Sequence, residues 1–494
     1  MCRHRLRTKY QTMKNEISEL FKCNYVYSDE KDAQEEILRK ISYSKKVVSK
    51  PEKVALIIPP SSQIPTPGRE FLVTGSFEGF TCVATLIKKM GHQLQVIDCR
   101  LKKNVKDFVI RNIKDASIIG IATYMDSFNF LQRITALIKE KYSDKLIFLG
   151  GSLVSSLPEI MLSQVNADCA ILGEAELTLI EFFHKYFGKE CFEYKNIKGM
   201  AYKNNGKIKI NLPRPQIKNL DNLPLLDYSI WPNHKSIIDK GQILISSMRG
   251  CPMECSFCFK TIPALRMKSL ERFEQEIVHL KEATKFNYTW LNDLTFNIDE
   301  ERAICIGEIM QKYSVKYHCF ARVTKFSKAL AKKLRKTGCL GVWFGMESYN
   351  QDVLDYNGKN VSIDDINRVV RICDDIGLAA RGLFIVGLYG ETEDSLKEML
   401  TFIKQKTFLP LVKYLVPFPG TALYKYALQS KKITDIVSFL RMLSRRKIRD
   451  HDDKIINLTG LQDEVLRYYF RQIWDITNKR EKFFAETEKK ECHE

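Results

Sequence analysis

Short apolar runs alternate with amphipathic helical stretches along most of this 494-residue chain, and they do so in two separate blocks. The first block starts at KVALIIPP (53–60) and ends near residue 190, and the second starts at QILISSMR (242–249) and ends near residue 425. Buried strands that alternate with helices are typical of parallel sheets whose faces are covered by helices. The alternation therefore predicts an α/β protein in which each block forms a domain of its own.

The first block predicts a doubly wound, Rossmann-like parallel sheet within residues 51–190. Its strands are expected at 53–60, 93–100, 116–124, 145–152 and at the start of ADCAILGEAELTLIEFF (167–183). In this fold, ligands bind at the carboxyl ends of the strands. The residues expected at those ends are Pro59, Pro60, Thr123, Tyr124, Gly150, Gly151, Ser152, Gly173 and Glu174.

The second block predicts a partial (β/α)6 barrel over residues 241–425, because six strand-like runs there are separated by helical stretches. Residues 191–240 lie between the blocks and contain a predicted hairpin, GMAYKNNGKIKIN (199–211), followed by a Pro-rich linker. Residues 1–50 are expected to form a helical N-terminal extension, and residues 426–494 a helical C-terminal region.

The composition is typical of a folded protein: 45% of the residues are hydrophobic and 28% are charged. No apolar run is long enough to span a bilayer and the N-terminus has no apolar signal segment, so we expect a cytoplasmic protein. The formal charge of +19 fits an anionic substrate or cofactor, or simply a lysine-rich composition. No RNA-binding motif accompanies this charge, so nucleic acid is not expected as a partner.

Three cysteines, Cys251, Cys255 and Cys258, lie close together in SMRGCPMECSFCFK (247–260), directly after the first strand of the second block. Three thiolates can hold three irons of a cubane iron–sulfur cluster, which leaves the fourth iron open to a substrate or cofactor. A structural zinc site usually has four protein ligands in two closely spaced pairs, and the chain supplies no second pair nearby. The spacing therefore favours an iron–sulfur cluster over a zinc site or a group of buried structural cysteines.

The segment CPMECSFC resembles the signature of the radical S-adenosylmethionine (radical SAM) enzymes. Five later segments resemble further motifs in the family's order: YTWLNDLTFNID (288–299), FARV (320–323), VWFGMESYNQDVLDYNGK (342–359), GLFIVGLYGETEDS (382–395) and VPFPGTALY (416–424). Tyr389 stands where the family usually has proline, which puts the expected loop shape in question but removes no reactive group. The resemblance implies a [4Fe–4S] cluster whose open iron binds S-adenosylmethionine (SAM), and reductive cleavage of SAM to a 5′-deoxyadenosyl radical.

The same resemblance implies a SAM site at the strand ends of the barrel. Phe257, between two of the cysteines, would contact the adenine, and Asn292 and Asp293 would accept hydrogen bonds from the SAM ammonium group. Glu347 and Ser348 would bind the ribose hydroxyls, as carboxylates commonly do in nucleotide sites.

Two basic residues have both a functional and a structural interpretation. Arg322 would pair with the SAM carboxylate, a contact suited to a guanidinium, or would form an ion pair with Glu347 that stabilises the barrel. Lys359 would serve the same carboxylate or would make only a surface salt bridge. Glu391 and Thr392, which follow Tyr389, could simply cap the next helix.

The first block resembles the cobalamin-binding domain of B12-dependent radical SAM enzymes. The stretches that carry this likeness are KKMGHQLQVIDC (88–99), SIIGIATYMDS (117–127), FLGGSLVSSLPE (148–159) and ADCAILGEAELTL (167–179). The likeness implies that Gly150 and Gly151 let the backbone approach the corrin ring or its nucleotide tail, and that Thr123 faces the cobalt or the corrin edge. The other residues implied to line this site are Tyr124, Ser152, Gly173 and Glu174.

The chain has no D-x-H-x-x-G run of the kind that supplies a histidine to cobalt in cobalamin mutases. His92, which follows Gly91, is better explained as a capping or surface residue. The B12-dependent radical SAM group also lacks that run, so its absence is consistent with the resemblance. A flavodoxin-like domain that binds another cofactor, or none, stays open as the alternative.

Together the two resemblances predict an enzyme that methylates an unactivated carbon through a 5′-deoxyadenosyl radical and methylcobalamin. A B12-dependent cyclase or ring-rearranging enzyme shares these motifs and is the main alternative. A methylthiotransferase with a second cluster on N-terminal cysteines, and a non-catalytic cobalamin-binding regulator, are the lesser alternatives.

The expected partners are a small-molecule or peptide substrate and an external electron donor such as flavodoxin or ferredoxin. The formal charge of +19 leans toward an anionic substrate. Abstraction of hydrogen from an sp3 carbon by a radical needs no general base, so no catalytic side chain is predicted.

Overall fold

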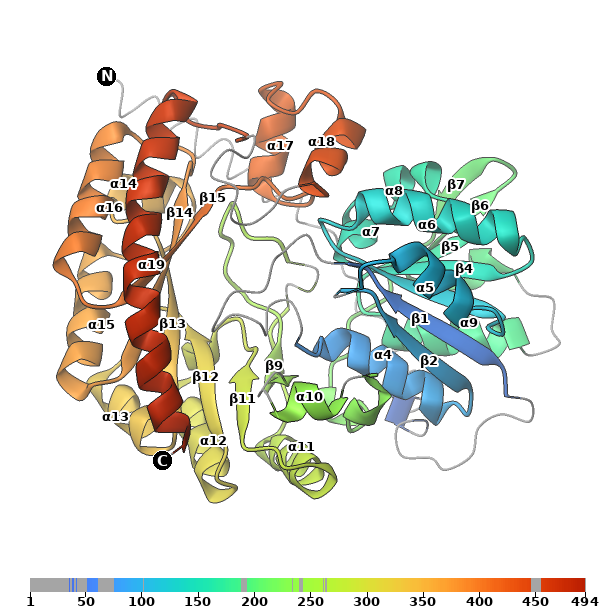
Figure 1. Ribbon diagram of the computed structural model, residues 1–494, viewed down its shortest axis with the longest axis horizontal. Coiled ribbons are helices and arrows are strands. Elements are labelled where there is room, and N and C mark those ends of the chain that lie inside the picture. The colour runs from blue at the N-terminus through green and yellow to red at the C-terminus, as the bar shows by residue number, and fades with distance from the viewer. Residues whose placement is uncertain are drawn as a thin grey trace.

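The structure is a computed structural model. It describes residues 51–60, 75–100, 102–187, 193–232, 234–239, 243–260, 264–445 and 455–493, with the single residues 35, 38, 39, 41 and 262. Two helix-covered sheets lie side by side, one in each block of the sequence (Figure 1). The N-terminal extension expected at residues 1–50 falls almost wholly outside the described residues, so its helical character stays a prediction.

The first sheet has seven strands in the order β2-β1-β3-β4-β5-β6-β7. Its parallel strands are β1 (Lys53–Ile58), β2 (Gln93–Asp98), β3 (Ile118–Thr123), β4 (Leu146–Gly151) and β5 (Cys169–Ile171). Its helices are α4 (Glu78–Lys89), α5 (Val105–Asn112), α6 (Phe128–Lys141), α7 (Ser152–Ser156), α8 (Pro158–Gln164) and α9 (Glu176–Phe187). This order confirms the predicted doubly wound sheet, and its switch point lies between β1 and β3, where such folds bind ligands.

The hairpin of β6 (Met200–Asn204) and β7 (Lys207–Ile210) extends the first sheet by two antiparallel strands. Asn205 and Gly206 form its turn with φ angles of 48° and 76°, the left-handed conformation that a two-residue hairpin turn requires. The predicted hairpin is confirmed. It belongs to the first sheet, not to the segment between the domains, because β6 pairs with the edge strand β5.

The chain then crosses to the second domain through short helical turns. These are η2 (Leu220–Asn222), η3 (Tyr228–Ile230) and α10 (His234–Asp239), while η1 (Tyr194–Asn196) precedes the hairpin. Trp231, directly after η3, is buried against the first domain and its Nε1 donates a hydrogen bond to Thr81 Oγ1 at 3.1 Å. The Pro-rich segment is therefore packed against the first domain.

The second sheet has six parallel strands in the order β15-β14-β13-β12-β11-β8, which is consistent with the predicted partial barrel. The strands are β8 (Leu244–Ile245), β11 (Tyr288–Leu291), β12 (Lys316–Ala321), β13 (Cys339–Glu347), β14 (Ala379–Val386) and β15 (Leu409–Tyr414). The helical elements are α11 (Leu270–Ala283), η4 (Phe296–Ile298), α12 (Glu300–Lys312), α13 (Lys328–Lys336), α14 (Gln351–Tyr356), α15 (Ile363–Ile376) and α16 (Glu393–Gln405). The predicted strand at 242–249 is divided: β8 joins the barrel, while β9 (Met248–Arg249) pairs antiparallel with β10 (Arg266–Met267).

The C-terminal region is mainly helical, as predicted, within the residues that the structure describes. Its helices are α17 (Ala422–Gln429), α18 (Ile436–Leu443) and α19 (Asp463–His493). The long α19 runs along the barrel (Figure 1), where Thr477 Oγ1 donates to the Pro410 carbonyl of β15 at 2.8 Å. In the turn after α18, Ser444 accepts a hydrogen bond from the Asn129 N–H of α6 at 3.2 Å. The C-terminal helices therefore contact both domains.

The two domains share a continuous hydrophobic core. One cluster of buried side chains includes Leu56 of β1, Trp231 of the connecting segment and Phe344 of β13. In the part of the chain that the structure describes, no helix is both long enough and apolar enough to cross a bilayer.

Candidate functional site

The three cysteines lie in one loop, residues 250–264, which leaves β9 and returns to β10; we call it the cysteine loop. Gly250 has a φ of +87°, and a Cβ atom there would lie 2.0 Å from the Ala264 carbonyl oxygen, so glycine is required where the loop meets its returning end. Cys251 and Cys255 are half-buried, and Cys258 is exposed. The loop thus presents three thiols near the carboxyl end of the first barrel strand.

Buried polar contacts fix the middle of the cysteine loop. The Ser256 N–H and Oγ donate to the carbonyl and Oδ1 of Asn357, at 3.0 and 2.9 Å. Asn357 is fully buried, and its Nδ2 donates to the carbonyls of Val353 and Tyr389 at 2.8 and 2.9 Å. The Leu423 N–H donates to the Ser256 carbonyl at 3.1 Å. Three later segments of the chain, α14, the loop after β14 and α17, therefore hold the cysteines in place.

The thiols of the cysteine loop have the chemistry of iron–sulfur cluster ligands. In the described residues, no three histidine, cysteine or carboxylate side chains are grouped so that they could hold one metal ion. A cubane spreads its thiolate ligands over separate irons. The donor set therefore fits an iron–sulfur cluster.

A cavity of about 500 Å³ adjoins the cysteine loop and is shared by the two domains. The first domain lines it with the carboxyl ends of β3 and β4 and with the segment after β5, including Gly150 and Gly173. The barrel side contributes Gly250, Lys260 and Asn292. A largely apolar cavity with a few polar groups is typical of a cofactor site. The cysteine loop and the switch point of the first sheet therefore open onto one space.

Two glycines leave room for a large group against the backbone. A Cβ atom on Gly150 or Gly173 would have no neighbouring atom within 4 Å, so both positions face open space. Gly151 differs, because a Cβ atom there would lie 2.6 Å from the Thr123 carbonyl oxygen; its φ is +119° and that of Gly173 is +72°, so the backbone conformation favours glycine at both positions. Gly151 serves the close packing of β4 on β3, whereas Gly150 and Gly173 fit the approach of a corrin ring.

The remaining residues predicted for the cobalamin site divide into two groups. Tyr124 lines the cavity, with its ring 5.2 Å from that of Phe77. Thr123 is fully buried and its Oγ1 accepts a hydrogen bond from the Val154 N–H at 3.1 Å, which satisfies the first turn of α7. Ser152 Oγ donates to the Thr123 carbonyl at 3.4 Å. The predicted contact of Thr123 with cobalt or the corrin edge therefore finds no support in its placement.

Glu174 lines the cavity, but its carboxylate is held by the barrel. Arg249 Nη1 lies 3.0 Å from its Oε1, Arg266 Nη1 lies 2.9 Å from its Oε2, and the Ile217 N–H donates to Oε2 at 2.9 Å. Although burial opposes ionisation, the two arginines lower the pKa of Glu174. Glu174 therefore connects the domains.

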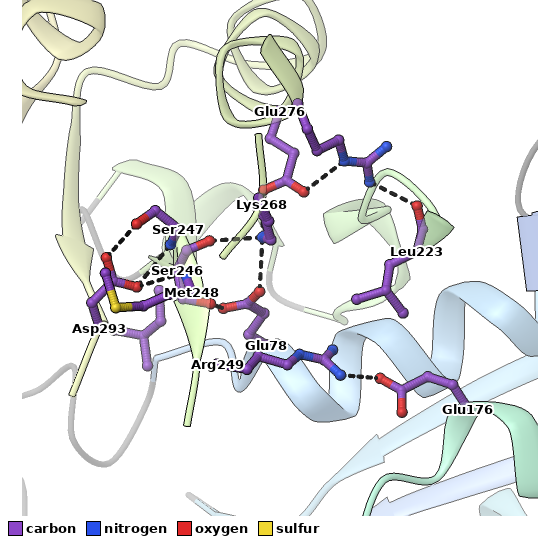
Figure 2. A network of polar contacts seen from close by, with 12 residues as sticks. Glu78, Glu176, Leu223, Ser246, Ser247, Met248, Arg249, Lys268, Glu276 and Asp293 are labelled. Carbon is purple, nitrogen blue, oxygen red and sulfur yellow. Dashed lines mark hydrogen bonds and ion pairs between the residues drawn. The ribbon is translucent and has the colours of Figure 1, made fainter. Parts of the chain in front are cut away.

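Asn292 and Asp293, predicted to act together on SAM, have different surroundings. Asp293 is buried, and its carboxylate accepts from the Ser247 N–H at 2.8 Å, from Ser247 Oγ at 2.7 Å and from the Met248 N–H at 3.0 Å (Figure 2). Burial raises the pKa of Asp293 to about 6. Asn292 is exposed and lines the cavity. Asn292 is therefore open to a ligand, whereas Asp293 supports the strand that leads into the cysteine loop.

Glu347 and Lys359 form a buried ion pair, with Lys359 Nζ 2.8 Å from Glu347 Oε1. Arg322 Nη2 donates to the carbonyls of Lys359 and Asn360 at 2.7 and 3.2 Å, so Arg322 fixes the segment that carries Lys359. The carboxylate of Glu347 is thus bonded to Lys359, and the alternative ion pair between Arg322 and Glu347 is not the one formed. Lys359 is buried, so the alternative prediction of a surface salt bridge is wrong.

Phe257 and Ser348 lie close to this ion pair. The Phe257 ring centroid is 6.0 Å from Lys359 Nζ, which places the cysteine loop beside the end of β13. Ser348 is buried, and its Oγ accepts a hydrogen bond from the Asn350 N–H at 3.3 Å. The structure therefore brings together the residues predicted for the adenine and the ribose.

Several residues that shape this site were not singled out from the sequence. The principal ones are Asn357, Arg249, Arg266 and Lys268, which anchor the cysteine loop and its flanking strands. The sequence offered two signals. One was Arg249, a charged residue directly before Gly250 and Cys251, and the other was Asn357, which lies within the segment 342–359 that resembles a family motif. Their partners lie far away along the chain, so neither signal identifies them alone.

Comparison with known proteins gives relatives over most of the chain. An uncharacterized methyltransferase of Pyrococcus horikoshii is 29% identical over 389 residues, which cover 76% of this chain and 83% of the relative. The bacteriochlorophyllide d C-8(2)-methyltransferase of Chlorobaculum tepidum is 23% identical over 374 residues, covering 71% and 76%. The solved radical SAM methyltransferase TsrM from Kitasatospora setae, with cobalamin and a [4Fe–4S] cluster bound, has a TM-score of 0.62 at 16% identity over 85% of both chains, which shows a shared fold.

Family models match both domains. The radical SAM superfamily model matches residues 245–403, and the B12 binding domain model matches residues 77–183. Together they cover more than half of the chain. The first match implies a [4Fe–4S] cluster and SAM, the second implies cobalamin, and the cysteine loop and the glycine-lined cavity fit these groups. The chain therefore belongs to the cobalamin-dependent radical SAM enzymes.

Proposed function

We propose that this enzyme transfers a methyl group to an unactivated carbon atom of its substrate. The observation that carries the proposal is the cavity of about 500 Å³ onto which both the cysteine loop and the switch point of the first sheet open. A substrate in such a space could meet a radical generator and a methyl carrier without leaving the protein. The methyltransferase names of two relatives agree with this reaction class.

The bound cofactors would supply one-electron cleavage of SAM and a carrier for its methyl group. The chain would hold the cluster through Cys251, Cys255 and Cys258, and the bonds from Asn357 to Ser256 would keep these thiols in place. The apolar cavity wall would exclude water from the reactive species. The protein's contribution is thus orientation and enclosure.

We assign direct SAM contacts to four residues around the cysteine loop. Phe257 and Asn292 would contact the nucleoside and the ammonium group, and the Glu347–Lys359 pair would meet the ribose and the carboxylate of SAM. The residues that would support these contacts from behind are Asp293, Arg322 and Ser348.

We assign the cobalamin site to the strand ends of the first sheet. Gly150 and Gly173 would lie against the corrin ring, and Tyr124 would pack beside it. Thr123, Gly151, Ser152 and Glu174 would act through the fold, because their polar groups or close packing already serve other segments.

Several finer points are also proposals. We place the domain boundaries at 51–190 for the cobalamin domain and 241–425 for the barrel, with the hairpin added to the first. The electron would come from an external donor such as flavodoxin or ferredoxin. A cytoplasmic location would keep reduced the ten cysteines that the structure describes as free. The excess of basic residues favours an anionic substrate.

The test is anaerobic reconstitution with iron, sulfide and cobalamin, followed by incubation with SAM labelled in its methyl group, a reductant and candidate substrates. We expect 5′-deoxyadenosine, label in the corrinoid fraction and a product heavier by one labelled methyl group. A product without label would instead favour the cyclase alternative. Failure to form 5′-deoxyadenosine in a fully loaded sample would contradict any radical SAM activity.

Replacement of one cluster ligand should affect the iron–sulfur cluster and leave cobalamin binding unchanged. Cys255→Ala is expected to abolish SAM cleavage, because an iron loses its ligand, while cobalamin stays bound to the first domain. Iron content, cobalt content and 5′-deoxyadenosine are measured on the same sample. Cys305→Ala, which removes a half-buried cysteine of α12 outside the loop, is the matched control and should cleave SAM like the parent. Equal cleavage by Cys255→Ala and the parent would refute the assignment.

A further inference from the structure

A buried ionic network lies where the two domains meet, next to the cavity (Figure 2). Four carboxylates and four cations take part, in two groups of ion pairs that each contain two carboxylates and two cations, one group around Arg249 and the other around Lys268. The carboxylates are those of Glu78, Glu174, Glu176 and Glu276, and the cations are Arg249, Arg266, Lys268 and Arg272.

The charges are divided between the domains. Glu78, Glu174 and Glu176 belong to the first domain: Glu78 begins α4, Glu174 lies between β5 and α9, and Glu176 begins α9. The cations that reach them lie on or directly after β9 and β10, the two strands that flank the cysteine loop. The loop is therefore attached to the cobalamin-binding domain by complementary charge on both sides.

Arg249 is the member closest to the cysteines. Its Nη1 lies 3.0 Å from Glu174 Oε1 and 2.8 Å from Glu176 Oε1, and its side chain is 12% exposed. In Figure 2 it extends from β9 toward Glu176, away from Asp293, which holds the backbone of the preceding residues. One residue, Gly250, separates Arg249 from Cys251.

The opposite side of the loop is held by Lys268. Its Nζ lies 2.7 Å from Glu276 Oε2 and 3.2 Å from Glu78 Oε1, and it donates to the Ser246 carbonyl at 2.7 Å. Glu78 in turn accepts a hydrogen bond from Ser246 Oγ. Buried charges are costly to desolvate unless they are paired in a defined geometry, so such a network resists alternative arrangements of the loop.

The network also forms part of the cavity wall. Glu78, Glu174, Glu176 and Arg249 all line the cavity that the cysteine loop shares with the strand ends of the first sheet. The Arg249 ion pairs therefore lie in the wall of the cavity onto which the cysteine loop and the strand ends of the first sheet both open.

We propose that Arg249, held between Glu174 and Glu176, is a positioning residue that sets the separation between the iron–sulfur cluster and the corrinoid. The inference rests on the proposed function, because it needs both cofactors in one chain. It assigns to the "GEAE" segment, which includes Glu174 and Glu176, a role in holding the cysteine loop.

The experiment measures that separation by pulsed electron paramagnetic resonance on the holoenzyme. Samples are poised so that the reduced cluster and cob(II)alamin each carry one unpaired electron, and the dipolar coupling between them reports their distance. The parent is expected to give one narrow distance distribution. Glu176→Gln, which keeps the side-chain size, and Arg249→Gln, which removes the guanidinium, are expected to broaden it, and Arg249→Lys to broaden it less.

Arg272→Gln is the matched control. It removes a guanidinium that is 2% exposed; the ion pair of Arg272 with Glu276 stays within α11, and its Nη2 donates to the Leu223 carbonyl of the connecting segment at 2.8 Å. This variant is expected to keep the narrow distribution of the parent. An equal broadening by Arg272→Gln would overturn the inference, because the effect would then be a general loosening of the fold.

The remaining outcomes are also decisive. Unchanged distributions in Arg249→Gln and Glu176→Gln overturn the inference, and if the arginine variant does not fold, Glu176→Gln decides alone. Iron and cobalt are quantified on every sample. A parent that takes up iron but no cobalamin, or cobalamin but no iron, overturns the proposed function and this inference together. A fully loaded parent with unaffected variants overturns only the inference.

Discussion

Glu391 is a buried carboxyl group beside the barrel strand β14. Its Oε2 accepts a hydrogen bond from the Gly387 N–H at 2.6 Å, and burial raises its pKa to about 8 from an ordinary value of 4.5. A group whose pKa is raised in the folded state favours the fold most below its unfolded pKa, and this contribution is lost as the pH rises through the folded pKa. The contribution of Glu391 to stability should therefore fall between about pH 4.5 and pH 8.

Glu391→Gln is neutral at every pH and keeps an acceptor for the Gly387 N–H. The free energy of unfolding of the parent, relative to that of this variant, is expected to fall by about 1.4 kcal/mol for each pH unit between roughly pH 5 and pH 8. Urea unfolding of both proteins at three pH values in this range measures the difference. Parallel stability curves would show that Glu391 is ionised in the folded protein at neutral pH.

The same short segment shows what could be predicted for single residues. The sequence offered Glu391 and Thr392 together as a helix cap. Thr392 does cap α16, with its Oγ1 accepting from the Ser395 N–H at 3.2 Å, because that bond is local in the chain. Glu391 is turned into the core instead, and its burial depends on segments that the local sequence does not specify.

At the scale of the elements, replacing either of two glycines at strand ends should weaken the binding of a different cofactor. Gly150→Ala places a methyl group in the open space at the end of β4, so cobalamin should bind about tenfold more weakly or worse, while iron content stays at the parent level. Gly250→Ala forces a Cβ atom against the Ala264 carbonyl oxygen and should lower iron content while cobalamin binding is kept. Cobalamin titration and iron analysis of both variants measure the effects, and a loss of both cofactors in either variant would contradict this separation.

The strand ends and the cysteine loop could be located from the sequence, because alternation and motif order fix which element carries which residue. The sequence could not show whether a side chain at a strand end faces a ligand or is bonded within the protein. The Thr123 hydroxyl accepts a hydrogen bond from the N-terminal turn of α7, and the Asp293 carboxylate accepts one from the turn between β8 and β9. Those partners are brought close only by the tertiary packing of the elements.

At the scale of the whole molecule, the domains should unfold together. Chains of this length commonly unfold in several steps, but one hydrophobic cluster here runs from Leu56 of β1 through Trp231 to Phe344 of β13. Urea unfolding followed by tryptophan fluorescence and by circular dichroism is expected to give one coincident transition. Two separated transitions would show that the cores of the domains are energetically independent.

The order of the two domains and their fold types were predictable, because each rests on periodic patterns inside its own block. The interface between them was not. Its ion pairs join residues as far apart in the sequence as Glu78 and Lys268. The local sequence around either residue does not indicate that the other is its partner. The hairpin at 199–211 shows the same effect, since its pairing with β5 makes it part of the first sheet.

The position of α19 has a consequence for how the protein is made. β15 is the last strand of the barrel sheet, and the helix that lies along it is contacted at Thr477, 67 residues after Pro410. At a synthesis rate of 5–20 residues per second, the ribosome needs roughly 3–13 s to deliver that helix. Throughout that interval the nascent barrel has an unprotected strand edge, so shielding by chaperones should matter most late in translation.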